Sequence, residues 1–180
     1  MKKVVLVWVL LMVAGGFCAG CVYVAFQQIE RQGANVPAAM VAQQAAYELS
    51  FGESPQNVLP SPTDLSQTIT PFVLVYDNNQ KLLASSANME GFSFPPGCLD
   101  QIDNSGESRV TWQPQNGLRF ATVGIKVKSG YVIGANSLSE SENATQSFGN
   151  TLLIGYALYA LGCAALALLL RLLTKRLKKH

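Results

Sequence analysis

The chain has 180 residues, which is enough for about one domain. Its charged fraction is 13% and its hydrophobic fraction is 49%, a balance that points towards a membrane protein. The net charge of +2 averages segments of opposite sign, so it carries no indication of a nucleic-acid partner, and we expect none.

Two stretches are apolar enough to cross a bilayer. Residues 4–26 and residues 151–170 contain no charged side chain. About 20 apolar residues in a helix span a hydrocarbon core about 30 Å thick. The sequence therefore predicts two transmembrane helices separated by a segment of residues 27–150.

The charges predict the orientation of these spans. The segment 27–150 holds all 11 acidic residues and six basic ones, whereas the tails 1–3 and 171–180 hold seven basic residues and no acid. Positive charge next to a span favours the cytoplasm. We therefore expect a two-span protein of the bacterial inner membrane, with both termini cytoplasmic and residues 27–150 outside.

The first span carries two competing signals. Gly16 and Gly20 have the small-xxx-small spacing that lets two helix backbones approach closely. The apolar run up to Cys21 also resembles a bacterial lipoprotein signal, in which cleavage before the cysteine would leave a lipid anchor. Because the apolar run continues past Cys21 to Phe26, we expect an uncleaved helix.

A helix is predicted over residues 36–51. Pro37 suits its first turn, and Gly52 is a plausible terminator. Its apolar face, which should pack on a sheet, consists of Met40, Val41, Tyr47 and Phe51.

Five strands are predicted after a loop of residues 54–70. Residues 71–86 form a hairpin, because β-branched and aromatic residues flank an Asp-Asn-Asn-Gln turn. Alternating patterns and a Gln-Asn-Gly turn indicate three further strands. The expected strands are residues 72–76, 82–84, 108–114, 118–128 and 131–135. A short helix at residues 98–104 and an exit helix at residues 137–147, which runs into the second span, complete the prediction.

The predicted fold class is α+β. Five antiparallel strands form a sheet with an N-terminal helix across one face, and two transmembrane helices flank it. This is the arrangement of a PAS-like domain held between two membrane spans.

Three runs carry a resemblance to a known group: PFVLVYDNNQKLLASS, TWQPQNGLRFATVG and GYVIGANSLSESE. They resemble small bacterial two-span membrane proteins with a PAS-like, Cache-type outer domain and, more distantly, the sensor domains of membrane histidine kinases. The likeness covers residues 27–145, and the run from Trp112 to Arg119 is its most specific part. The triplet Asn35-Val36-Pro37 departs from the Asn-Asp-Pro of that group. The resemblance implies binding of a small molecule between the sheet and the loop of residues 88–97, and supplies no catalytic residues.

The residue inventory argues against catalysis. The single histidine is His180. The segment 27–150 therefore has no histidine with which to form a Ser-His-Asp triad, a Cys-His pair or a histidine metal cluster. We expect no enzyme activity, no cofactor and no metal. Cys98 is the one cysteine of the outer segment, and it is either a half-buried small residue or a disulfide partner for another chain.

Five residues are candidates for ligand binding. Arg109 and Arg119 lie on adjacent predicted strands and could bind a carboxylate through paired hydrogen bonds, or could face solvent beside acids such as Glu107. The aromatic candidates, which could line a pocket or fill the core, are Trp112, Tyr76 and Tyr131.

The second span contains a stripe of small residues at 3-4-3 spacing. Such a stripe favours close helix packing in lipid, although ordinary alanine content gives the same pattern. Its members are Ala157, Ala160, Ala164 and Ala167.

Together these features predict an extracytoplasmic sensor or ligand-binding module without catalytic output of its own. The sequence ends about ten residues after the second span, so a signal would pass laterally to a partner membrane protein or to a second copy. We expect a homodimer that packs through the spans. The alternative is a structural or assembly subunit whose outer domain binds another protein.

Overall fold

The computed structural model describes residues 2–65 and 70–177. Parts of the predicted tails (1 and 178–180) and of the predicted loop (66–69) lie outside the described residues. The chain divides into two compact units. The first comprises Met1–Ile29 with Ala144–His180, and the second comprises Glu30–Asn143.

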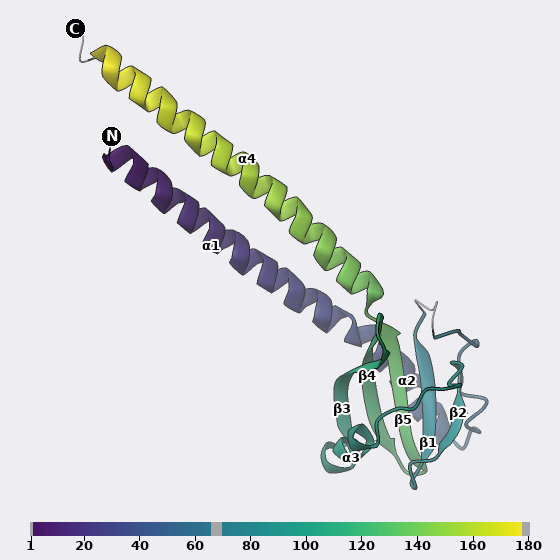
Figure 1. Cartoon of the computed structure of the whole chain (residues 1–180). Coiled ribbons are helices and arrows are strands. Elements are labelled where there is room, and N and C mark those ends of the chain that lie inside the picture. Colours follow the sequence, from purple (N-terminus) through teal and green to yellow (C-terminus); the bar gives the residue numbers. More distant parts are fainter. Residues whose placement is uncertain (1, 66–69, 178–180) are drawn as a thin grey trace. The chain divides into compact units, whose positions relative to one another are not determined.

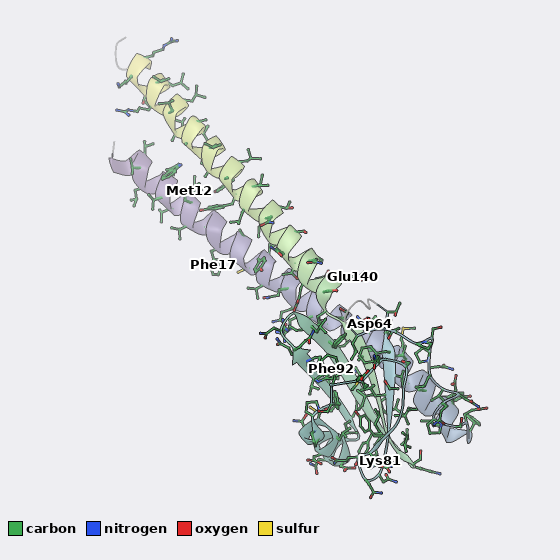
Figure 2. All side chains as sticks on the ribbon, turned by 45° about the vertical axis from the view of Figure 1, so that its right-hand side comes forward. Met12, Phe17, Asp64, Lys81, Phe92 and Glu140 are labelled. Atoms are coloured by element: carbon green, nitrogen blue, oxygen red, sulfur yellow. The ribbon has the colours of Figure 1, made fainter. Side chains whose placement is uncertain are left out.

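The first unit is formed by two long helices, α1 (Lys2–Gly33) and α4 (Ser139–Leu177) (Figure 1). Both are long and apolar enough to cross a membrane. The predicted exit helix and the second span form one uninterrupted helix, α4. Figure 2 shows side chains standing out along both helices, among them Phe17, which is 74% exposed.

The two long helices contact each other through aromatic residues of this unit. The rings of Phe26 and Phe148 stack with their centroids 4.1 Å apart. Further along, the Tyr156 hydroxyl donates to the Met12 carbonyl at 2.9 Å. A tyrosine hydroxyl in an apolar surrounding needs such an acceptor, so this bond fixes the tyrosine against α1.

Helix α1 passes through Cys21 without interruption. We therefore expect the protein recovered from membranes to retain residues 1–20, with an intact mass close to 19.3 kDa. Intact-mass spectrometry checks this. A shorter, lipid-modified species that begins at Cys21 would show that the first span is a lipoprotein signal.

The second unit is built on a five-stranded antiparallel sheet, so the predicted α+β class and strand number are confirmed. The strand order is β2-β1-β5-β4-β3, which places β1 and β5 side by side near the centre. The strands are β1 (Phe72–Asp77), β2 (Leu82–Ser85), β3 (Glu107–Gln115), β4 (Leu118–Val127) and β5 (Gly130–Ser137).

The predicted turns close two of the three hairpins formed by consecutive strands. Between β1 and β2, the Asp77 carboxylate accepts hydrogen bonds from the backbone N–H groups of Asn79 and Lys81, each at 2.8 Å. Figure 2 shows Lys81 at the tip of this hairpin. Between β3 and β4, Gln115 pairs with Leu118, as expected for a two-residue connection.

The α2 helix (Asn35–Ser50) and the α3 helix (Pro96–Ser105) cover opposite faces of the sheet (Figure 1). Alternation along each strand sends successive side chains to these two faces. On β1, Val73 and Val75 lie in the cluster beneath α2. The side chains that alternate with them, Phe72, Leu74 and Tyr76, lie in the larger cluster beneath α3.

Candidate functional site

The face of the sheet beneath α3 is filled by packed aromatic side chains. Trp112 is 4% exposed, and its ring centroid lies 5.6 Å from that of Phe94 and 5.7 Å from that of Phe120. Leu99 and Ile102 of α3 are each 1% exposed and join the same cluster. The region where the resemblance implies a ligand is thus occupied by the protein's own side chains.

The two tyrosine candidates lie opposite each other on β1 and β5 and belong to the same cluster. Burial raises the pKa of Tyr76 to about 12, while a hydrogen bond with the backbone of Phe94 acts in the opposite direction. Both phenols are therefore neutral at physiological pH and act as packing and hydrogen-bonding groups.

Tyr131 belongs to a polar network that fastens α3 to the sheet. Its hydroxyl donates to the Asp103 carboxylate at 2.5 Å, and the Lys126 ammonium donates to the same carboxylate at 2.7 Å. The bonds from Lys126 and Tyr131 lower the pKa of Asp103. The bond to Asp103 in turn raises the pKa values of Lys126 and Tyr131. Asp103 is held ionised by Lys126 of β4 and Tyr131 of β5. These contacts connect α3 to two strands, so the role of Asp103 is structural.

The two arginine candidates are paired with acids near the surface. The Arg109 Nε donates to Glu107 at 2.7 Å, and the Arg119 guanidinium pairs with Glu142. Strand alternation places both arginines on the face opposite to Trp112, Tyr76 and Tyr131. The five ligand candidates therefore do not converge on one site.

Metal ligands and cysteine were the other candidates for chemistry. The described residues contain no group of three or more His, Cys, Asp or Glu side chains that could hold a metal ion. Cys98 is a free, half-buried thiol at the edge of the α3-side cluster. Its burial raises the pKa of the thiol, which reduces the reactive thiolate at neutral pH.

The exposed surface of α2 is the most unusual feature of the second unit. Four large apolar side chains lie on one stripe of this helix and its C-terminal cap, and each is more than half exposed. We call this stripe the α2 surface. Its members are Val36 (57% exposed), Met40 (64%), Tyr47 (62%) and Phe51 (72%).

The expectation that Met40, Tyr47 and Phe51 pack on the sheet is wrong. The side chains that face the sheet are the alanines Ala38, Ala42 and Ala45, each at most 1% exposed. The reason is that the α2 backbone lies directly over Gly134 of β5, so little space separates the helix from the sheet. Large residues are excluded from so close a contact and are turned outwards. The 4-3 spacing of the alanines was the signal that sequence reasoning missed.

The α2 surface is also almost free of charge. The only ionisable side chains on α2 are Tyr47 and Glu48, and Glu48 bonds to Gln44 on the same helix. The rings of Tyr47 and Phe51 contact each other edge to face, with centroids 4.7 Å apart. Depletion of charge and exposed aromatic rings are features of protein–protein interface cores.

The small residues predicted to pack the spans have different surroundings. A Cβ on Gly16 would lie 3.3 Å from the Tyr156 hydroxyl, so Gly16 faces α4 of its own chain. A Cβ on Gly20 would meet no atom within 4 Å. Of the alanine stripe, Ala157 is exposed and Ala160 is partly covered, whereas Ala164 and Ala167 line a cleft between the two long helices.

A comparison of the chain with protein-family models, with curated proteins and with solved structures finds no match, so the site rests on the geometry alone.

Proposed function

We propose that the chain is a non-enzymatic, two-span membrane protein whose PAS-like outer domain associates with the outer domain of a second copy. The α2 surface carries this proposal. The five-stranded antiparallel sheet with a helix across one face supports the PAS-like assignment. The two long apolar helices and the basic tails support an inner-membrane location with residues 27–150 outside.

The filled interior supports protein binding over ligand binding. A pocket for a small molecule is usually a preformed concavity with a few convergent polar groups. Here Trp112 is enclosed by Phe94 and Phe120, and the two arginines lie on the other face. The outward-facing α2 surface, in contrast, offers exposed apolar and aromatic side chains to a partner.

The size and chemistry of the α2 surface fit a second copy of the same domain. Four side chains of this kind offer on the order of 500 Å² per copy, so a symmetric pair would bury about 1,000 Å², the lower bound for a specific interface. A two-fold interface brings the same patch together with itself. An uncharged stripe can do so without like-charge repulsion. Anchoring in one membrane also raises the effective concentration of the two copies.

Disulfide crosslinking of the full chain in membranes tests the proposal. In a background in which the four native cysteines are replaced by serine, Met40→Cys should give a covalent dimer on mild oxidation. The control is Gln113→Cys, because Gln113 is exposed on the edge strand β3 and does not belong to the α2 surface. Adding Tyr47→Glu should lower the dimer yield about tenfold, since it buries an unpaired charge.

Equal crosslinking from Met40→Cys and Gln113→Cys would show random collision and contradict the proposal. A Met40→Cys adduct with a different protein would identify the α2 surface as a heterologous interface, which is the assembly-subunit alternative. Near-UV circular dichroism of each variant verifies that the fold is intact.

A small-molecule sensor is the second candidate, favoured by one observation. Phe94, which covers Trp112, belongs to the irregular segment 86–95 rather than to a helix or strand. Movement of this segment would expose the aromatic face to a ligand. Mass spectrometry of small molecules that co-purify with the full chain tests this, and a stoichiometric compound displaced by Phe94→Trp would favour the sensor.

A further inference from the structure

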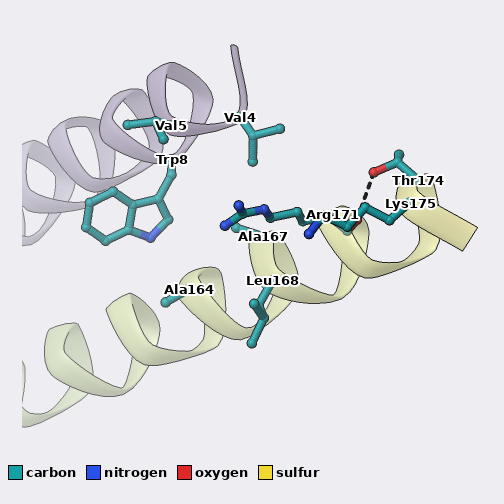
Figure 3. A pocket seen from close by; sticks show the side chains of 9 residues that line it. All are labelled: Val4, Val5, Trp8, Ala164, Ala167, Leu168, Arg171, Thr174 and Lys175. Atoms are coloured by element: carbon teal, nitrogen blue, oxygen red, sulfur yellow. Dashed lines mark hydrogen bonds between the residues drawn. The ribbon is translucent and has the colours of Figure 1, made fainter. Parts of the chain in front are cut away.

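A cleft lies between α1 and α4 at the end of the first unit where α1 begins and α4 ends (Figure 3). Its volume is about 520 Å³. Most of its lining is apolar, and the lining residues are Val4, Val5, Trp8, Ala164, Ala167, Leu168, Arg171, Thr174 and Lys175.

The cleft exists because small and large residues alternate along α4. Ala164 and Ala167 face α1 on successive turns and leave space that larger side chains would fill. The Trp8 ring extends into this space from α1 (Figure 3). Its indole nitrogen is buried and has no hydrogen-bond partner within the described part of the chain. An indole N–H in an apolar surrounding requires an acceptor, and the described residues supply none to the Trp8 N–H.

The mouth of the cleft is cationic. Arg171 and Lys175 lie one turn apart on α4, and Figure 3 shows the Arg171 side chain extending beside Ala167 into the space between the helices. Residues 1–29 and 143–180 contain no Asp or Glu, so this end of the unit carries an excess of positive charge. An occupant with a negative group and an apolar body is complementary to this combination of basic and apolar lining.

We propose that the cleft binds one anionic phospholipid. The phosphate lies at Arg171 and Lys175, where a guanidinium can form paired charge-assisted hydrogen bonds. An acyl chain runs along Ala164 and Ala167, and an oxygen of the lipid accepts the Trp8 N–H. Tryptophan is enriched at the level of the headgroups, and basic pockets between transmembrane helices are suited to anionic headgroups. A free phosphate would leave the apolar part of the cleft unfilled, which favours the lipid.

The test uses the full chain in nanodiscs of phosphatidylcholine with a small fraction of phosphatidylglycerol. Native mass spectrometry after release into detergent should show one phosphatidylglycerol retained per chain. Arg171→Gln should lower this retention about tenfold, as expected for loss of a charge-assisted contact. Arg176→Gln is the matched control, since Arg176 carries the same charge on α4 but does not line this cleft.

A second pair of variants distinguishes lipid binding in the cleft from general attraction of lipid to the protein surface. Ala164→Leu fills the cleft and should abolish retention. Ala165→Leu makes the same change at the next residue, which is exposed and does not line the cleft, and should have no effect. Helical circular dichroism establishes that each variant is folded.

Three results would overturn the proposal. The first is equal loss of lipid in Arg171→Gln and Arg176→Gln, which would mean diffuse attraction to the headgroups. The second is equal retention in Ala164→Leu and Ala165→Leu, which would place the lipid elsewhere. The third is release of the lipid by millimolar inorganic phosphate, which would identify a site for a free anion.

Discussion

Replacement of Trp112 by alanine is expected to lower the free energy of unfolding of the second unit by about 3–5 kcal/mol, the usual cost of removing a large buried aromatic side chain. Trp112 is 4% exposed and packs against Phe94 on one side and Phe120 on the other. Its removal leaves a cavity that a sheet strand and a short helix cannot close. Because domains are stable by only about 5–15 kcal/mol, the loss is a large part of the total.

Hydrogen exchange of the β5 amides in the full chain, held in detergent micelles, measures this change without relying on tryptophan fluorescence. The matched control is Tyr47→Ala, which removes an aromatic ring that is 62% exposed and should change stability by no more than about 0.5 kcal/mol in the monomer. If Trp112→Ala and Tyr47→Ala had the same effect, Trp112 would not be a core residue.

Local patterns were sufficient to predict the elements of this fold. The Asp77 turn, the Asn116-Gly117 connection and the alternation of β4 depend on residues close in sequence, and their chemistry determines the backbone directly. The two long helices follow from uncharged runs in the same way. The predicted helix over residues 36–51 differs from α2 by one residue at each end.

What the sequence could not predict depends on contacts between distant segments. The orientation of α2 is determined by Gly134, about 90 residues further along the chain, since only that contact selects the alanine face over the face with Met40 and Tyr47. The pairing of Arg119 with Glu142 and the filling of the α3 side by Phe94 are also long-range. A local pattern identifies an apolar residue but not whether it packs inwards or stays exposed.

Replacement of Gly134 by alanine is expected to destabilise the second unit by about 3 kcal/mol or more, because overpacking against rigid backbone is costly. An added Cβ would lie 2.0 Å from the Ala38 carbonyl oxygen and 2.9 Å from the Ala42 nitrogen. Both atoms belong to the α2 backbone, which cannot rotate away as a side chain could. The helix must therefore move off the sheet, which opens the cluster formed by Ala42, Ala45 and Val132.

The control for this change is Gly97→Ala in α3. A Cβ there would meet no atom within 4 Å, and the backbone is helical, so the substitution should stabilise the unit by about 0.5–1 kcal/mol. Hydrogen exchange of the β5 amides again provides the measurement. Because displacement of α2 also disturbs the α2 surface, Gly134→Ala should reduce Met40→Cys crosslinking, whereas Gly97→Ala should leave it unchanged. A Gly134→Ala protein as stable as the native chain would show that α2 does not lie against β5 at this distance.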